Sequence, residues 1–577
     1  MSEIPSRNDI LAASSESGLM GYLFEVAPKH VWCRKPEFLA TVAELVGSSE
    51  RTLFTEKDWT FLNGMSGPSF FHGMALLCEL IPLLDVGHRD MMQLVKTLVH
   101  LGGEDLAAQQ PNVAFRSWCS ADPARVRAVL DDARVGDNLA IDHLCFALEV
   151  GAESADAMAF LKEGPAPEVQ MGAAAALGRM ALDAEDAAPV VRSLSEVSIK
   201  ADDPRVRINA LLSSFAVLEK NPELPREDAR RALVAALDDT SAETLNALSA
   251  LVWRHGKSLS EDEGRWLLTA LQSIDPEHRG TLQQIDFATP DLLSGGYSDA
   301  LFTLVAELVR RSQGRIGLND FPNLRRELVD GDLRRLSKLA IKWLLEGNPH
   351  LCLTLAEQFD AVGAQQTTFE LQVEDMPVDP DDQLFLCRKA VGFLFHTPVT
   401  AASVLIAVIR HGDNRIIQDL LNLLSDPLLI NFGGELRLYL DQVVERTSDP
   451  RVARIGEALT RRQKELDDLV GIETLVELHP SEIHRQIERA RWNRHMAQVM
   501  KKGMEESVVF NLVHKQHILY GTKSSSYIDD PSGDTRQVNV EMGSHSVTFE
   551  YPHSDILDPE GLHMKLFELR YEQRTRL

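Results

Sequence analysis

One phrase of the sequence recurs at a fixed spacing. The segment 166–173 (APEVQMGA) is followed 37 residues later by 203–210 (DPRVRINA) and, after a further 37, by 240–247 (TSAETLNA). A fixed period in this range is typical of proteins that stack copies of one supersecondary unit, because a single unit cannot bury its apolar face alone. Such proteins usually present surfaces that hold other molecules, so the repeat favours a binding function over a catalytic one.

The residues around the repeat predict pairs of helices. Apolar residues recur at helical spacing over 204–218, and the dipeptide Asp203-Pro204 supplies an N-cap and a first-turn proline. A second helix is expected to begin near Pro225, and its apolar stretch 231–237 returns 34 residues later as 265–271. The different spacings of the first and second helices indicate loops of changing length around a constant helical pair.

The helix start Asp-Pro-x-Val-Arg, followed a turn later by a small residue, resembles the HEAT and armadillo-like family of α-solenoid repeats. The resemblance is carried by Asp203, Pro204, Val206, Arg207 and Ala210, with partial echoes at 122–127 and 449–453. The third copy departs from the pattern at Ser241 and Glu243. The resemblance covers 164–274 clearly and other parts loosely, and it implies a right-handed solenoid that binds and scaffolds without shared catalytic residues.

Length and charge are consistent with a long repeat array. A chain of 577 residues suggests three or four domains or one array, and the repeat favours the array. The 59 Lys and Arg against 86 Asp and Glu give a formal net charge of −27. Non-specific attraction of the whole molecule to DNA, RNA or anionic lipid is therefore not expected, and a polyanion would need a local basic patch.

The cysteines and the amino terminus favour a reducing, cytoplasmic location. The six cysteines are scattered singly without a CxxC pair, which predicts small buried hydrophobes rather than a disulfide framework or a zinc site. Residues 1–9 are polar and lack the basic and apolar regions of a signal peptide.

One uncharged segment approaches the length of a membrane span. It covers residues 390–409, but His396-Thr397-Pro398 lies in its middle, and Thr before Pro is a strong start signal for a helix. We expect two short buried helices joined by a turn, with a transmembrane helix as the alternative.

The sequence predicts four regions. They are an atypical helical N-terminal capping region (1–120), a HEAT-like α-solenoid (121–470), a basic helical segment (471–510) and a small β-containing C-terminal module (511–577). A Gly-rich turn predicts an interruption of the array within 286–319. The expected fold class is mainly α: a right-handed α-solenoid of HEAT-like helix pairs with a small C-terminal α+β module.

The last hundred residues differ from the repeat. Residues 480–502 predict a basic helix. The segments 537–542 and 546–551 alternate apolar and polar residues around Gly543-Ser544-His545, which predicts a β-hairpin. Residues 562–574 predict either a third strand or a final helix.

Catalytic and cofactor signatures are missing from the sequence. It contains no GxxxxGK phosphate loop, no strand-led GxGxxG and no HExxH. Residues 296–300 resemble a nucleophile elbow but end in Ala. We expect no catalytic residue, cofactor or metal site.

A hydrolase in the C-terminal module is the weakest alternative, because the preference of aspartate for turns explains the aspartates of this module. Its candidate residues are His514, His517, Asp529, Asp530, Asp534 and His545.

Two basic islands interrupt the acidic chain. One spans residues 310–342, with nine Lys or Arg against four acids, and the other spans 485–502. The candidate partner- or polyanion-binding residues are Arg325, Arg326, Arg334, Arg335, Lys338, Arg485, Arg489, Arg491 and Arg494. On a solenoid such islands can meet an acidic protein or a phosphate backbone, and the alternative is a pair of solvated helix faces.

These observations favour a non-enzymatic scaffold or adaptor that binds protein partners within a larger assembly. The Ala-, Leu-, Arg- and Asp-rich composition suggests a bacterial source, where repeat proteins often belong to multi-protein systems, including defence systems. A nucleic-acid-binding accessory protein that uses the two basic islands is the second hypothesis. No membrane partner is expected, and the oligomeric state is left open.

Overall fold

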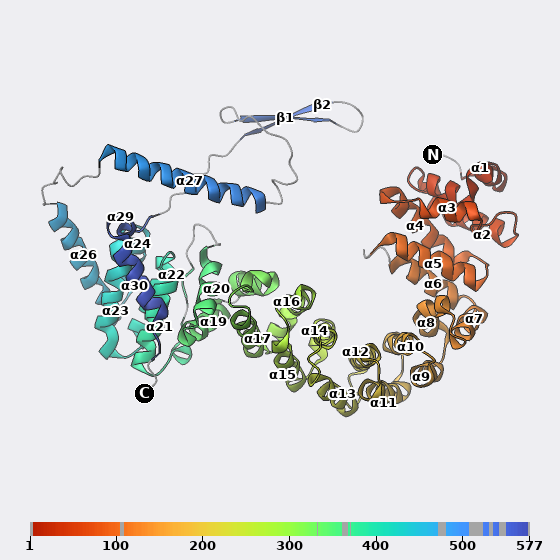
Figure 1. The fold of residues 1–577 in the computed structure, drawn as a ribbon, viewed down its shortest axis with the longest axis horizontal. Coiled ribbons are helices and arrows are strands. Elements are labelled where there is room, and N and C mark those ends of the chain that lie inside the picture. The colour runs from red at the N-terminus through yellow and green to blue at the C-terminus, as the bar shows by residue number, and fades with distance from the viewer. Residues whose placement is uncertain are drawn as a thin grey trace. The chain divides into compact units, whose positions relative to one another are not determined.

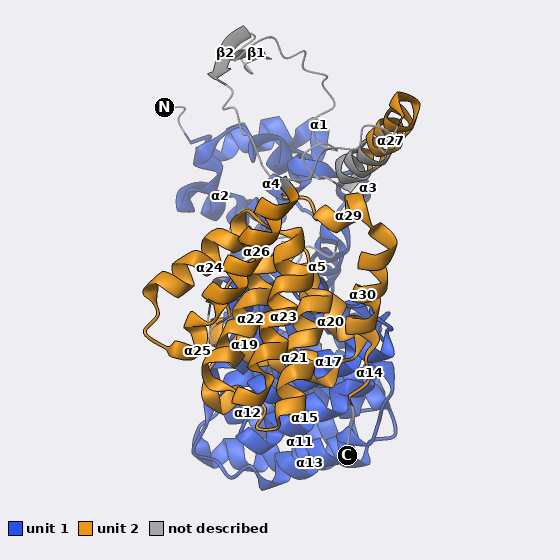
Figure 2. Cartoon of the chain, turned by 90° about the vertical axis from the view of Figure 1, so that its left-hand side faces the viewer, with its two compact units in different colours: residues 1–331 blue, residues 332–577 orange. Residues whose placement is uncertain are grey.

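The computed structural model describes residues 4–103, 109–331, 333–360, 367–369, 371–470, 481–506, 523–529, 535–541 and 550–574. Most of these residues are helical, so the fold is mainly α, as the sequence predicts (Figure 1). The chain divides into two compact units, residues 1–331 and 332–577 (Figure 2).

The first unit begins with helices of uneven length and spacing. They are α1 (Arg7–Val26), α2 (Pro36–Gly47), α3 (Glu56–Asn63), α4 (Gly67–Leu80), α5 (His88–Gly102), α6 (Gln110–Ser120) and α7 (Pro123–Arg134), with 3-10 turns η1 (Val31–Arg34) and η2 (Ile81–Leu83). Aromatic side chains pack among them, including Phe24 with Phe61 and Trp32 with Phe38.

From α6 onward, alternate helices form two rows (Figure 1). The first row consists of α6, α8 (Asn138–Gly151), α10 (Pro167–Arg179), α12 (Pro204–Lys220), α14 (Ala242–His255) and α16 (Arg279–Ser294). The second row consists of α9 (Ser154–Glu163), α11 (Ala184–Lys200), α13 (Glu227–Leu237), α15 (Glu261–Ala270) and α17 (Ser298–Arg311). Each helix packs against the next in its row, and most also pack against a neighbour in the other row.

The repeated phrase forms the beginning of three first-row helices. Ala173, Ala210 and Ala247 occupy the same repeat position and are all buried, so a small residue is kept where the helices pack. Between α10 and α12 a Cβ added at Gly178 would lie 3.0 Å from Cβ of Ser213, which explains the glycine. The rows therefore pack through small side chains at repeated positions.

The helix starts expected from Asp-Pro dipeptides are present. Asp122, Asp203 and Asp449 each N-cap a helix, and each side chain accepts a hydrogen bond from the backbone N–H two residues later. The third copy lacks the proline. There Ser241 is the N-cap, and its side chain accepts from the N–H of Thr244.

The prediction that the array is interrupted within 286–319 is wrong. Gly295 and Gly296 form a turn between α16 and α17, with φ of +85° at Gly296. Helix α16 packs on α14, and α17 packs on α15, so both rows continue through this segment. The unit ends with the 3-10 turn η6 (Leu318–Asp320), the short α18 (Pro322–Arg326) and the π-helical η7 (Glu327–Gly331). Two further 3-10 turns, η4 (Gly256–Ser258) and η5 (Leu271–Ser273), lie between longer helices.

The second unit is a further set of packed helices. They are α19 (Leu333–Glu346), α20 (Pro349–Asp360), α21 (Pro380–Phe393), α22 (Pro398–His411), α23 (Ile417–Leu423), α24 (Glu435–Arg446), α25 (Pro450–Ala453) and α26 (Ile455–Val470), with turns η8 (Val373–Asp375), η9 (Asn414–Ile416) and η10 (Leu424–Leu429). Helices α19, α21, α22, α24 and α26 pack successively.

The uncharged segment 390–409 forms parts of two helices, as predicted. Helix α21 ends at Phe393 and α22 begins at Pro398, and the apolar side chains of both are buried. Among the helices of the described ranges, none combines the length and apolar character needed to cross a bilayer.

The elements that follow α26 are of two kinds: α27 and two strands come first, and then a final helix that packs on α21. The described elements are the long α27 (Glu482–Glu506) and the antiparallel strands β1 (Lys523–Asp529) and β2 (Thr535–Glu541). The predicted basic helix is therefore present. Strand β2 includes most of the predicted 537–542, but it pairs with 523–529, and residues 542–549 of the expected hairpin lie outside the described residues.

The final segment is helical. Helices α29 (His553–Leu557) and α30 (Pro559–Tyr571) follow, and α30 packs on α21 with Leu562, Leu566 and Leu569 buried. The helix alternative for 562–574 is thus confirmed. Because α30 covers α21, residues 471–549 connect two segments of the same helical set.

Candidate partner-binding surface

The first basic island is divided by the boundary between the units. Arg325 and Arg326 lie on α18 in the first unit, whereas Arg334, Arg335 and Lys338 lie on α19 in the second. Several of its cations are engaged within the chain. Arg310 pairs with Glu307 at 2.5 Å, Arg315 with Glu277 at 3.7 Å and Lys338 with Asp375 at 3.7 Å, and Arg326 donates to Asn323 at 3.1 Å.

The part of this island on α19 forms one stripe. Arg334, Lys338 and Lys342 are four residues apart and exposed. The opposite face of the helix is buried through Leu336, Leu339, Ala340 and Trp343. The structure therefore brings three cations together on α19.

The second island lies on α27, which is solvated along its described side chains. Helical spacing puts Arg485 and Arg489 on one face and Arg491 and Arg494 on another. Arg485 pairs with Glu482 at 3.1 Å, and Arg494 donates to the carbonyl of Ala490 at 3.2 Å. The basic residues of α27 therefore surround the helix instead of forming one stripe.

A surface on the first row was not predicted from the sequence. A cavity of about 450 Å³ lies between the ends of α6, α8, α10 and α12. Arg116 donates to Glu149 Oε1 at 2.7 Å, while Oε2 of Glu149 is buried and has no hydrogen-bond partner among the described residues. Its lining residues are Gln109, Asn112, Val113, Arg116, Phe146, Glu149, Gly178, Arg179 and Lys220.

Lys220 joins two repeats at the edge of this cavity. Its ammonium donates to the carbonyls of Gly178, Arg179 and Met180 at 3.0, 2.7 and 3.3 Å. These carbonyls end α10, where intrahelical donors are lacking. Burial lowers the pKa of Lys220. The lysine thus fixes the position of α12 against the end of α10.

Arginine and aromatic side chains continue along the row. The guanidinium of Arg179 lies 5.5 Å from the ring centroid of Phe146, and that of Arg254 lies 5.7 Å from Trp253. The rings of Trp253 and Phe287 are 5.8 Å apart, and these side chains are 40% and 46% exposed. Trp253 stands two 37-residue steps after Arg179, so both occupy the same repeat position.

We call this set the first-row surface. Its members are Arg116, Phe146, Glu149, Arg179, Lys220, Trp253, Arg254 and Phe287. The repeat alignment alone relates Arg179 to Trp253, but the two residue types differ, so no motif marks the surface. Which of these side chains are exposed depends on how the helices pack, and the sequence alone does not show it.

Four of the six cysteines are buried, and Cys78 and Cys145 are half-buried. The six cysteines are free, and burial raises the pKa of each thiol, to about 12 for Cys78, Cys119 and Cys352. Within the described ranges, no cluster of three or more His, Cys, Asp or Glu is arranged to hold a metal ion. Of the hydrolase candidates, Asp529 ends β1, and the others lie outside the described residues.

Comparisons with known proteins add no assignment. No protein-family model matches the chain, and no curated protein matches its sequence.

Proposed function

We propose that this chain is a right-handed, HEAT-like α-solenoid that scaffolds protein partners within a larger assembly, with a small C-terminal α+β module. The 37-residue repeat and the two rows of successively packed helices support the solenoid. Its partners would be proteins, and the scaffold itself would carry out no catalysis.

The observation that carries the proposal is the first-row surface. Arginine and aromatic residues are enriched at protein interfaces, and Trp and Arg dominate the energetic centres of such interfaces. Here they stack in pairs at two places along the first row, between α8 and α10 and between α14 and α16. Trp253 and Phe287 are exposed, and Phe146 is half-buried. A face of this kind suits a protein partner that contacts more than one repeat.

The test is quantitative affinity capture with a double variant, Arg179→Ala with Trp253→Ala. The matched control is Arg265→Ala with Trp266→Ala, which removes the same residue types from exposed positions on the second row. The first variant should lose partner binding about tenfold or more, since hot-spot truncations cost about 2 kcal/mol or more. Equal recovery with both variants would contradict the proposed surface.

A second candidate is binding of nucleic acid through the basic islands. The exposed stripe on α19 and the solvated arginines of α27 favour it. It predicts binding that weakens steeply with salt and is abolished by charge reversal at Arg334, Arg335, Arg489 and Arg491. Absence of binding at low salt would remove this candidate.

The region between α26 and α29 has a proposed role of its own, to hold a second partner or an oligomer. Because α30 covers α21, a fair test removes residues 471–549, bridges the ends with a Gly/Ser linker and keeps α29 and α30. Loss of some partners or of an oligomer supports the role. An unchanged set of partners and an unchanged mass contradict it.

A further inference from the structure

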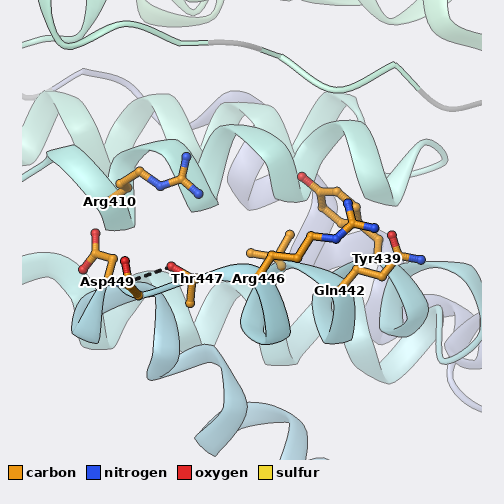
Figure 3. A pocket seen from close by; sticks show the side chains of 8 residues that line it. Arg410, Tyr439, Gln442, Arg446, Thr447 and Asp449 are labelled. Carbon is orange, nitrogen blue, oxygen red and sulfur yellow. Dashed lines mark hydrogen bonds between the residues drawn. The ribbon is translucent and has the colours of Figure 1, made fainter.

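A second pocket lies in the second unit between α22, α24 and the start of α25 (Figure 3). Its volume is about 420 Å³. Arg410 reaches over it from the end of α22, while Tyr439, Gln442 and Arg446 extend from α24. Residues 439, 442 and 446 share one face of α24 because they are three and four residues apart.

The donors of this pocket are unused. Within the described residues, neither Arg410 nor Arg446 makes a hydrogen bond or an ion pair, and neither does the hydroxyl of Tyr439 or the amide of Gln442. Nearby arginines are engaged: Arg437 lies 3.7 Å from Asp441 on the same helix. Two unpaired guanidinium groups therefore line one cavity of an acidic protein.

Among the described lining residues Asp449 is the only carboxylate, and its Oδ1 caps the start of α25. Its Oδ1 accepts a hydrogen bond from the N–H of Arg451 at 2.8 Å. The backbone N–H of Asp449 donates to Oγ1 of Thr447 at 3.1 Å (Figure 3). Burial raises the pKa of Tyr439, so its phenol stays protonated and able to donate. The acids Asp441 and Glu445 of α24 line a different pocket.

We propose that the pocket of Arg410, Tyr439, Gln442 and Arg446 binds a phosphate monoester. A phosphate monoester carries nearly two negative charges at neutral pH and three strong acceptor oxygens. Two guanidinium groups match that charge, and each presents a planar fork that pairs with phosphate oxygens in bidentate fashion. The phenol and the amide supply further neutral donors for the remaining oxygen lone pairs.

The volume exceeds that of a phosphate group alone, so the pocket has room for the group that bears it. That group is either a phosphorylated side chain of a protein or a small metabolite such as a nucleoside monophosphate. The site lies on a different unit from the first-row surface and is independent of the scaffold proposal.

The experiment is isothermal titration of the full chain with inorganic phosphate, a phosphoserine peptide and AMP. The unphosphorylated peptide and its Ser→Glu form are the comparators. At least one phosphate monoester should bind one-to-one and more than about tenfold tighter than the carboxylate peptide. Tighter binding of the phosphopeptide identifies a protein source, and tighter binding of AMP identifies a nucleotide.

Variants locate the binding. Arg410→Gln and Arg446→Gln should each weaken phosphate binding about tenfold or more, since each removes a charge-assisted hydrogen-bond donor. Arg446→Lys keeps the positive charge but loses the planar guanidinium, so it should also weaken binding. This variant keeps the test valid if the glutamine variant fails to fold. Arg461→Gln, an exposed arginine of α26 outside the described pockets, is the control with equal charge loss.

Two results would overturn the proposal. One is the absence of binding by every phosphate monoester at millimolar concentration. The other is binding that persists unchanged in Arg410→Gln and Arg446→Lys. Partner capture through the first-row surface is measured separately, so failure of either proposal is distinguishable from failure of the other.

Discussion

The ammonium of Lys389 on α21 donates a hydrogen bond to the main-chain carbonyl of Arg570 on α30 at 2.5 Å. It also donates to the carbonyl of Glu572 at 2.8 Å. In return, Nε of Arg570 donates to the carbonyl of Gly392 at 2.6 Å. Lys389 is fully buried, and its charge is compensated by these two carbonyls at the end of α30. These bonds fasten the last helix to the helical set that the chain left after α26.

Substitution of this lysine should loosen α30. Lys389→Met keeps the aliphatic stem but removes the charged donor, which leaves the two carbonyls unpaired. We expect the free energy of unfolding to fall by about 1.5–3 kcal/mol. Amide hydrogen exchange over 559–571 should accelerate. Arg388→Met is the control, because its pair with Glu572 is partly exposed and worth less than about 1 kcal/mol. Equal exchange in both variants would show that Lys389 does not hold the helix.

The repeated alanine should tolerate no larger side chain. Ala210 is fully buried between first-row helices, so Ala210→Leu should destabilise the first unit by about 1–3 kcal/mol through overpacking. Ala235→Leu on the exposed face of α13 is the control and should be close to neutral. Thermal unfolding followed by circular dichroism measures both. A stable Ala210→Leu variant would contradict the packing of the rows.

Acid should weaken the contact between α13 and α15. Burial alone would raise the pKa of Glu263, but hydrogen bonds from Arg226, Ser260 and Arg230 and the charge of Arg226 bring it below its ordinary value. A carboxyl whose folded pKa is lowered stabilises the fold above its unfolded pKa, and this contribution is lost as pH falls through the folded pKa. Stability should therefore decline below about pH 4.

The change Glu263→Gln isolates this effect. The variant should be less stable than the parent at pH 7 and should lose less stability between pH 7 and pH 3, as measured by thermal unfolding. The control, Glu261→Gln, removes an exposed carboxylate from the same helix. Parallel pH profiles for Glu263→Gln and the parent chain would rule out this titration.

The thiols should be unreactive in the folded protein. Burial raises the pKa of Cys145 to about 11 and that of Cys119 to about 12, so little thiolate exists at pH 8. Iodoacetamide should modify none of the six cysteines in minutes under native conditions and all six in denaturant, as read by mass spectrometry. Rapid native modification of any one of them would show that its site opens.

Local signals predicted the helix boundaries well. The side chains of Asp122, Asp203 and Asp449 cap helices because Asp before Pro satisfies a free N–H and presets the first turn. The dipeptide Thr397-Pro398 separates α21 from α22 for a similar reason, since proline starts a helix readily and does not continue one. These effects act over a few residues, so the sequence alone reveals them.

Long-range relationships were not predictable in this way. Lys389 and Arg570 are 181 residues apart, and no local pattern pairs them. The same holds for β2, whose pairing with the preceding segment 523–529 was not predicted. The first-row surface also depends on packing, because Arg179 and Trp253 share a repeat position but differ in type. The basic islands were visible as composition, yet their ion pairs and their division between the units were not.

Amide hydrogen exchange on the complex with a captured partner is the decisive measurement for the scaffold proposal. We predict slower exchange in the first-row helices α8, α10, α14 and α16, with the second-row helices α11, α13 and α15 unchanged. Protection confined to the second row or to α27, with the first row exchanging as in the free chain, would contradict the proposal.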